Sequence, residues 1–175
     1  MIFGSFSLNT GPDQAIEKII ATAKQPGLSV HPVCAPGFSG GCFINERLPH
    51  TFNEVIYTDV GNDIMVLISG AVYNRSELQS IIGRGASVTD PELIARLFNQ
   101  FGPGFVGNLN GDFAICIFRP GAKRLFLFRD HVGIMPLAFR ADGRSLSFST
   151  DITGLSRAVS GGGDINTSWL TGHFR

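Results

Sequence analysis

Three cysteines and one histidine are the side chains of this sequence best suited to nucleophilic or acid–base chemistry. Cys34, Cys42 and Cys116 have no neighbouring His, and their spacing is not that of a metal site. Cys116 lies inside the apolar run 113–118, which favours a buried small hydrophobe over a nucleophile. His131 is a candidate general base, or part of a structural turn. The residues thus offer single candidates but no catalytic pair, and we predict no metal site.

A glycine-rich segment near the end of the chain invites a phosphate-binding interpretation. Residues 160–164 have the sequence Ser-Gly-Gly-Gly-Asp, and loops of this kind hold a pyrophosphate with backbone N–H groups. Such a loop needs an apolar strand before it and a helix after it. No apolar strand precedes Ser160, so we interpret the segment as a linker.

Composition and charge exclude several classes of function. The chain has 175 residues, of which 43% are hydrophobic and 16% charged, as in a compact globular protein. Lys plus Arg equal Asp plus Glu at 14 each, so no net charge attracts nucleic acid or an anionic membrane. The sequence shows neither a signal peptide nor an apolar run long enough to span a membrane. We therefore expect a soluble, cytoplasmic protein.

The elements that must position these side chains follow from hydrophobic periodicity. Residues 2–8 predict a strand, residues 15–23 an amphipathic helix, and residues 28–69 a meander of antiparallel strands. Asn74 can cap a helix through Ile82, and Thr89 or Asp90 can cap a second one. Segments 112–118 with 124–129, and 137–140 with 145–149, predict two hairpins.

Helices that cluster between groups of strands favour a layered α+β fold over a doubly wound parallel sheet. We count roughly eight to ten strands and four helices. Residues 155–163 turn small and polar, and residues 164–174 become amphipathic again. We therefore predict a domain over residues 1–154, and a linker with the start of a following domain over residues 155–175.

Four segments in order carry a resemblance to a known family. They are Gly-Ala-Val-Tyr-Asn (70–74), Thr-Asp-Pro-Glu-Leu (89–93), Leu-Asn-Gly-Asp-Phe-Ala (109–114) and Arg-Asp-His-Val-Gly-Ile-Met-Pro-Leu (129–137). Together they resemble the class II glutamine amidotransferase domain of asparagine synthetases, over nearly the whole chain. The resemblance implies an Ntn-hydrolase-like fold, a four-layer αββα sandwich of two antiparallel sheets.

The same resemblance implies that the glutaminase chemistry is lost. In the family an N-terminal Cys attacks the glutamine carboxamide, and its own α-amino group acts as base. When the Ile-Phe-Gly segments are matched, that Cys falls just before Met1, and neither Met1 nor Ile2 offers a thiol or hydroxyl. We therefore assign no catalytic residue. A Cys supplied by an upstream start codon is the alternative.

The substrate-binding positions of the family are only partly retained. Its Asn-Gly oxyanion pair maps onto Ser69 and Gly70, which replaces a donor worth about 3 kcal/mol by a shorter hydroxyl. The Glu that follows becomes Ala71. Arg47 and Asp90 match the residues that hold the glutamine carboxylate and amine. Arg47 is equally interpretable as a solvated surface residue, and Asp90 as a helix cap.

Domains of this family without the Cys resemble those at the front of β-lactam synthetases and lasso-peptide cyclases. We therefore expect a degenerate N-terminal domain that serves as scaffold or substrate-docking domain for an ATP-dependent amide-forming enzyme. The domain itself needs no cofactor, whereas the expected synthetase domain needs ATP and Mg. Its own C-terminal synthetase domain is the expected partner, with a small amino acid or peptide substrate and possible homodimerisation. An amino-acid-binding module is the alternative from another class.

Overall fold

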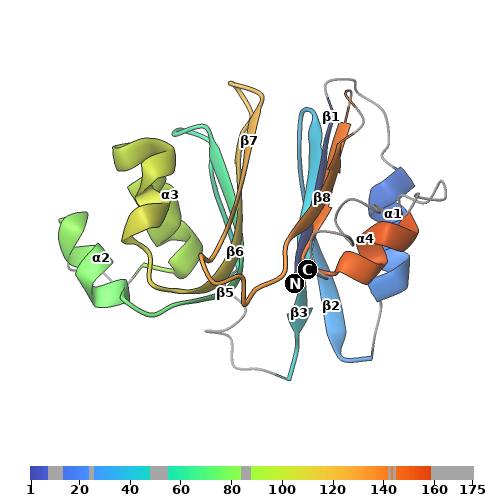
Figure 1. Ribbon diagram of the computed structural model, residues 1–175. Coiled ribbons are helices and arrows are strands. Elements are labelled where there is room, and N and C mark those ends of the chain that lie inside the picture. The colour runs from blue at the N-terminus through green and yellow to red at the C-terminus, as the bar shows by residue number, and fades with distance from the viewer. Residues whose placement is uncertain are drawn as a thin grey trace, which may run out of the picture.

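Two antiparallel sheets face each other, and helices cover their outer sides (Figure 1). The computed structural model describes residues 1–7, 14–23, 26–47, 55–83, 88–141, 143 and 145–158. In chain order the elements are β1 (Ile2–Ser7), α1 (Gln14–Ala23), β2 (Leu28–Ala35), β3 (Phe38–Asn45), β4 (Ile56–Asp59), β5 (Ile64–Val72), α2 (Arg75–Ile81), α3 (Asp90–Phe101), the 3-10 helix η2 (Gly102–Asn108), β6 (Gly111–Arg119), β7 (Arg124–Arg129), β8 (Ala138–Ala141), β9 (Ser145–Ser149) and α4 (Ile152–Ala158).

The strands form a five-stranded sheet A, ordered β2-β3-β1-β9-β8, and a four-stranded sheet B, ordered β4-β5-β6-β7. All recorded strand pairs are antiparallel. Helices α2 and α3 cover the outer side of sheet B, and α1 and α4 cover the outer side of sheet A (Figure 1). The predicted α+β fold, a four-layer αββα sandwich, is confirmed.

Each of the three spaces between layers holds its own hydrophobic core. In β5 the side chains of Ile64, Val66 and Ile68 face α3, whereas Met65 and Leu67 face sheet A. This alternation follows from the two-residue period of a strand, and both faces are apolar because both are covered. The two sheets are joined in the central core, where the rings of Phe38 and Phe118 stack with centroids 4.8 Å apart. The third core lies between sheet A and its helices.

Helix α4 lies across the predicted domain boundary. Leu155 and Ala158, one helical turn apart, are buried against Ile19 and Ala23 of α1. The linker predicted from residue 155 therefore begins within a helix that packs on sheet A. Residues 159–175, which hold the Ser-Gly-Gly-Gly-Asp segment and the rest of the predicted linker, lie outside the described residues.

Both predicted hairpins are present, as the pairs β6–β7 and β8–β9. Thr89, one of the two predicted caps of α3, is the N-cap, and its hydroxyl accepts from the N–H of Glu92 at 3.4 Å. Asn74 occupies the N-cap position of α2 without capping it. Its side chain instead accepts from the N–H of Asn110 and donates to the carbonyl of Asn108, which ties α2 to the start of β6.

Candidate functional site

The predicted binding positions in sheet B lie where β5 leads into α2, at the lower end of the sandwich in Figure 1. Ser69 and Ala71 alternate with Ile68, so they continue the face of β5 that looks toward sheet A. Ser69 is buried, and Ala71 is exposed at the rim. The chain start lies at the same end, where the carbonyl of Met1 accepts from the N–H of Phe43. This rim between the two sheets is the candidate site.

The backbone at Gly70 has the geometry that only glycine accommodates. Its φ is 112°, and a Cβ added there would lie 1.9 Å from the carbonyl oxygen of Asp112 on the paired strand β6. A side chain is therefore excluded both by conformation and by contact. The glycine of the predicted Ser69–Gly70 pair is thus dictated by the fold, whereas the identity of residue 69 is not.

Opposite Ala71 lies Asp112, an acidic residue for which the sequence alone suggests no role. Asp112 pairs with Ala71 in the β5–β6 register, and its Oδ2 accepts from the hydroxyl of Tyr73 at 2.5 Å. This hydrogen bond is the main reason why the pKa of Tyr73 is raised, so the phenol stays protonated at neutral pH. Both residues lie within the segments that carry the family resemblance, 70–74 and 109–114. Their contact, however, follows only from the pairing of β5 with β6.

A buried carboxylate organises the loop between β7 and β8. Burial alone would raise the pKa of Asp130, but hydrogen bonds from the backbone N–H groups of Met135, Ile134 and Gly133 outweigh it and hold that pKa at about 2. The N–H of Asp130 in turn donates to the carbonyl of Phe113 at 2.9 Å. Its neighbour His131, the candidate general base, is exposed in this loop. The loop is therefore fixed to β6 by Asp130.

Asp90 is engaged by a neighbouring helix. Its carboxylate forms an ion pair with the guanidinium of Arg75, the first residue of α2. The side chain of Asp90 is 22% exposed and that of Arg75 is 35% exposed. Because Thr89 is the N-cap of α3, the cap interpretation of Asp90 does not hold. The carboxylate that the resemblance assigns to the amine of glutamine is therefore already paired with a cation of this chain.

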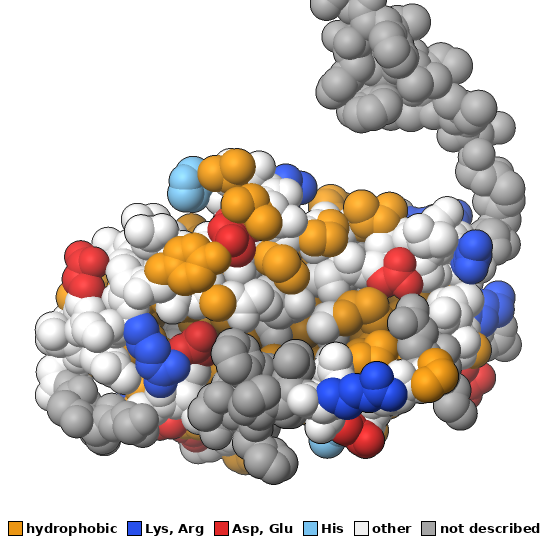
Figure 2. Space-filling model, turned by 90° about the horizontal axis from the view of Figure 1, so that it is seen from below, with side chains coloured by type: hydrophobic (Ala, Val, Ile, Leu, Met, Phe, Trp, Pro, Cys, Tyr) orange, Lys and Arg blue, Asp and Glu red, His pale blue; other side chains and the backbone are white. Residues whose placement is uncertain are grey.

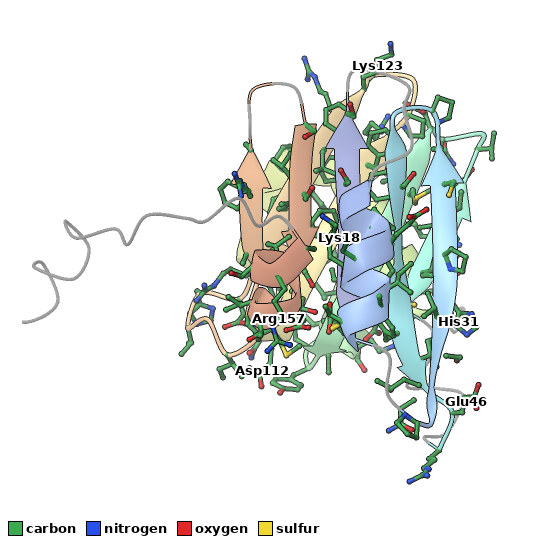
Figure 3. All side chains as sticks on the ribbon, turned by 90° about the vertical axis from the view of Figure 1, so that its right-hand side faces the viewer. Lys18, His31, Glu46, Asp112, Lys123 and Arg157 are labelled. Atoms are coloured by element: carbon green, nitrogen blue, oxygen red, sulfur yellow. The ribbon has the colours of Figure 1, made fainter. Side chains whose placement is uncertain are left out.

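Arg47 lies in the turn that follows β3 of sheet A and is exposed. Its backbone N–H donates to Oδ1 of Asn45 at 3.0 Å, and its Nε lies 3.3 Å from where a Cβ would stand on Gly27. Glu46, which precedes Arg47 in the chain, and Asp112 both lie at the lower end of the molecule, well apart from each other (Figure 3). Within the described ranges no hydrogen bond or ion pair joins Arg47 to Asp90. The two predicted clamp residues thus lie on different halves of the sandwich, Arg47 after β3 of sheet A and Asp90 at the start of α3 on sheet B.

The thiols nearest the site are poor nucleophiles. Cys42 is buried in the central core opposite Ile2, and this burial raises its pKa to about 11. Cys116 is also buried, and burial raises its pKa well above the usual value. Both are therefore neutral thiols at physiological pH, whereas the thiolate is the reactive form. Cys34 is exposed on β2.

The surface of this end mixes apolar, acidic and basic side chains (Figure 2). Exposed apolar side chains come from the end of β5 and from the β7–β8 loop: Tyr73, Val132 and Ile134. Among the residues that the structure describes, no three His, Cys, Asp or Glu side chains gather as a metal site would require. No helix in the described ranges is long and apolar enough to cross a membrane.

Comparisons with known proteins agree with this architecture. Residues 52–157 match the family model described as glutamine amidotransferase domain. The candidate glutamine-hydrolysing asparagine synthetase 2 of Methanocaldococcus jannaschii is 33% identical over 107 residues, which cover 59% of this chain and 21% of that protein. The glutamine-hydrolysing asparagine synthetase 2 of Bacillus subtilis is 33% identical over 94 residues, covering 53% and 13%. That of Oryza sativa is 30% identical over 124 residues, covering 66% and 21%.

The chain thus spans about a fifth or less of the length of these relatives. Among solved structures, the glutamine phosphoribosylpyrophosphate amidotransferase of B. subtilis, complexed with ADP and GMP, superposes with a TM-score of 0.61. That match covers 90% of this chain and 43% of the other at 13% sequence identity, so it bears on the fold alone. It agrees with the predicted Ntn-hydrolase-like sandwich.

Proposed function

This chain belongs to the glutamine amidotransferase domain family of asparagine synthetases, and from that premise we propose that it no longer hydrolyses glutamine. Its role is that of a scaffold or substrate-docking domain in an ATP-dependent amide-forming enzyme. The catalytic work of that enzyme, with ATP and Mg, belongs to a synthetase domain. The macrolactam- and β-lactam-forming enzymes with Cys-less front domains are the nearest functional type.

The observation that carries this proposal is the altered rim at the end of β5. Glycine at position 70 is required by the backbone, so its presence reflects the fold rather than activity. The two side chains flanking it, Ser69 and Ala71, lack the carboxamide and carboxylate that the family places there. Loss of one oxyanion donor costs about 3 kcal/mol of transition-state stabilisation. The rim therefore keeps the backbone conformation of the family but lacks the two polar side chains that flank the glycine.

Two carboxylates that already have partners within the chain support the same conclusion. The carboxylate of Asp90 is paired with Arg75, and that of Asp112 accepts a hydrogen bond from the Tyr73 hydroxyl. An incoming amino-acid ammonium would have to displace Arg75 from Asp90 before it could bind there. This arrangement favours a scaffold over an amino-acid-binding module, the alternative function for a domain with these positions.

The test is glutamine-dependent ammonia release by the full-length natural protein, with its N-terminus identified by mass spectrometry. We expect release at the rate of the enzyme-free control, with and without ATP and Mg. Release above that background would overturn the proposal. A Cys found at the native N-terminus, together with activity, would assign the chain to the glutamine-hydrolysing class.

Calorimetry distinguishes the scaffold from the binding module. Glutamine, asparagine and glutamate are titrated into the same protein, and we expect no heat of binding at the candidate site. Binding that is abolished by Arg47→Ala and by Asp90→Asn would favour the module. Binding unaffected by either substitution would place the ligand elsewhere on the protein.

A further inference from the structure

Strand β7 is an open edge of sheet B. The sheet has the order β4-β5-β6-β7, so within the described residues no strand pairs with the outer side of β7. The N–H of Asp130 donates to the carbonyl of Phe113 at 2.9 Å, which makes these two residues a hydrogen-bonded pair of the β6–β7 ladder. Because such pairs alternate along antiparallel strands, the N–H and C=O groups of Leu125, Leu127 and Arg129 point away from β6. They form a row with which another strand can pair.

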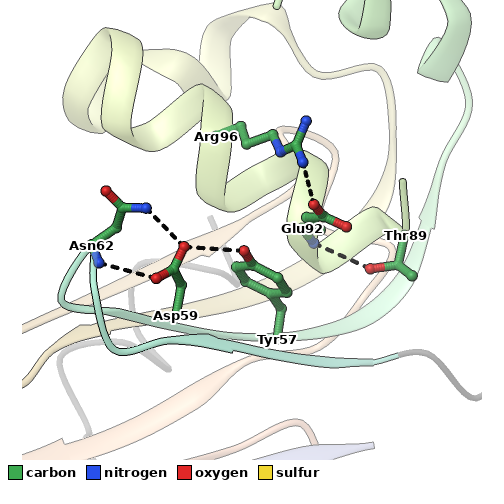
Figure 4. A network of polar contacts seen from close by, with 6 residues as sticks. All are labelled: Tyr57, Asp59, Asn62, Thr89, Glu92 and Arg96. Atoms are coloured by element: carbon green, nitrogen blue, oxygen red, sulfur yellow. Dashed lines mark hydrogen bonds and ion pairs between the residues drawn. The ribbon is translucent and has the colours of Figure 1, made fainter. Parts of the chain in front are cut away.

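The other edges of the two sheets are shorter or interrupted. Strand β4 has four residues, and the turn after it is closed by hydrogen bonds from Asn62 to Asp59, the last residue of the strand (Figure 4). Strand β8 also has four residues, and β2 carries Pro32, which has no N–H to donate. Strand β7 has six residues and no proline. Among the described strands it is therefore the edge best suited to pair with an added strand.

The apolar side chains of β7 are left partly uncovered. Residues 125–128 are only partly buried, whereas residues 115–118, which lie opposite them on the central strand β6, are all buried. Leu125 and Leu127 border the core between the two sheets, and Phe126 and Phe128 border the core beneath α3. A further strand beside β7 would therefore cover apolar surface on both faces of the sheet.

The charges of β7 indicate which kind of strand fits this edge. Arg124 and Arg129 are exposed at its two ends, and the exposed Lys123 precedes it. Within the described ranges neither guanidinium has a hydrogen-bond or ion-pair partner. The carboxylate of Asp130, the nearest acid along the chain, already accepts from three backbone N–H groups. The edge is thus cationic at both ends, which favours a guest strand with acidic ends.

A second copy of this chain is disfavoured as the occupant. Pairing of two copies through β7 would bring together two segments that each carry Lys123, Arg124 and Arg129. Like charges on neighbouring strands destabilise the pairing, and charged edge residues protect natural sheets from self-association in this way. A strand of another polypeptide, with acidic ends, meets no such repulsion.

We propose that β7 binds an extended acidic peptide, a segment of a separate polypeptide, by strand addition. The peptide backbone pairs antiparallel with the outward groups of Leu125, Leu127 and Arg129. A carboxylate at each end of the peptide pairs with Arg124 and Arg129, and apolar residues between them cover the half-buried side chains of β7. This site does not depend on the proposed function.

The test uses three capped hexapeptides, titrated into the isotope-labelled chain and followed by NMR. Glu-Thr-Val-Thr-Val-Glu places a carboxylate opposite each arginine, Lys-Thr-Val-Thr-Val-Lys reverses both charges, and Glu-Thr-Pro-Thr-Val-Glu removes the peptide N–H that pairs with Leu127. With the first peptide we expect saturable shifts and slowed exchange of the backbone N–H groups of Leu125, Leu127 and Arg129. Affinity for each of the other two should be at least about tenfold weaker.

Several results would overturn the proposal. They are the absence of saturable shifts at these three N–H groups, and an affinity for either control peptide equal to that for the first. A dimer of the free chain in sedimentation, with the same three N–H groups already protected from exchange, would assign β7 to a second copy instead.

A charge exchange tests the direction of the added strand. In the antiparallel arrangement the last residue of the peptide lies opposite Arg124. Arg124→Glu should therefore lower affinity for the peptide with two glutamates about fivefold and restore it for Glu-Thr-Val-Thr-Val-Lys. Lys18→Glu, the same change of charge on the exposed face of α1, is the matched control and should leave both affinities unchanged (Figure 3).

Arg129→Glu with Lys-Thr-Val-Thr-Val-Glu repeats the exchange at the other end of β7, and it replaces the first exchange if Arg124→Glu does not fold. Affinity retained by both arginine variants, or lost equally in Lys18→Glu, counts against pairing at β7. Recovery with the opposite peptide in each case would contradict the antiparallel arrangement.

Discussion

The two sheets contribute to the candidate rim in different ways. On the sheet B half, three acidic groups at the rim are bonded within the chain: Asp90 to Arg75, Asp112 to Tyr73, and Asp130 to three backbone N–H groups. On sheet A, Arg47 is exposed, and its recorded hydrogen bond is made by its backbone N–H. One half of the rim is thus closed by internal contacts, and the other half is open.

Under the proposed loss of glutamine hydrolysis, this difference indicates what the fold retains. Groups on sheet B that could hold a substrate hold neighbouring elements together instead, so they continue to contribute to stability. Among the residues that the structure describes, the Arg47 side chain makes no hydrogen bond or ion pair that would give it such a second role. We therefore expect substitutions on the sheet B half to affect folding and those on the sheet A half to leave it unchanged.

The largest effect should come from Gly70→Ala on the sheet B half. A Cβ there would lie 1.9 Å from the Asp112 carbonyl oxygen, and φ is 112°. We expect a loss of about 3 kcal/mol in the free energy of unfolding, measured by chemical denaturation. Gly83→Ala has a φ of 71° but nothing within 4 Å of the added atom, and should lose only about 1 kcal/mol.

Gly104→Ala completes this series as the control. Its added Cβ meets nothing within 4 Å, and it lies on the exposed surface of η2. We expect a change within about 0.5 kcal/mol. If all three variants were equally stable, close packing of β5 against β6 would not be what requires glycine at position 70.

A smaller effect is expected for Asp130→Asn, because Asn retains an acceptor oxygen for part of the loop. The pKa of Asp130 in the folded chain is about 2, below its ordinary 3.8, so ionisation favours the folded state. That contribution is complete above about pH 4 and is lost as the pH falls toward 2. We expect the variant to be less stable at pH 7 and the difference from wild type to shrink across this window.

Thermal unfolding of both proteins at a series of pH values measures this difference. The melting temperature of the variant should lie a few degrees below that of wild type at neutral pH and approach it near pH 2. Curves that remain parallel through this window would show that the Asp130 carboxylate does not secure the β7–β8 loop.

The fold was predictable from the sequence because strand and helix periodicities are local. The alternation in 64–68 and the helical spacing of Leu93, Ile94 and Leu97 are visible without knowledge of the partners. The short helix α4 was not recognised, since Leu155 and Ala158 are separated by the exposed polar residues 156 and 157. Its burial depends on α1, which is distant in the sequence.

The candidate site was predictable only in its positions. Gly70 and Asp90 were singled out by the family resemblance, whereas their surroundings depend on contacts across the chain. Asp112 lies 39 residues from Tyr73, and Arg75 lies 15 residues before Asp90. No local pattern encodes such pairs.

A modest effect is expected when the Arg75–Asp90 ion pair is broken. Both side chains are partly exposed, so the coupling energy from a double-mutant cycle of Arg75→Met and Asp90→Asn should be about 0.5 kcal/mol. Arg75→Met also frees the Asp90 carboxylate. If internal pairing is what closes this half of the rim, calorimetry should detect glutamine binding in Arg75→Met and none in wild type or the double variant.

The smallest effect on stability is expected for Arg47→Ala on the sheet A half. The side chain is exposed, and its recorded hydrogen bond uses the backbone N–H, which alanine retains. We expect a change within about 0.5 kcal/mol by chemical denaturation. A loss comparable to that of Gly70→Ala would contradict an open sheet A half, because it would require the guanidinium beside Gly27 to secure the end of β3. Arg47→Lys then separates charge from geometry, since lysine keeps the charge but not the planar fork.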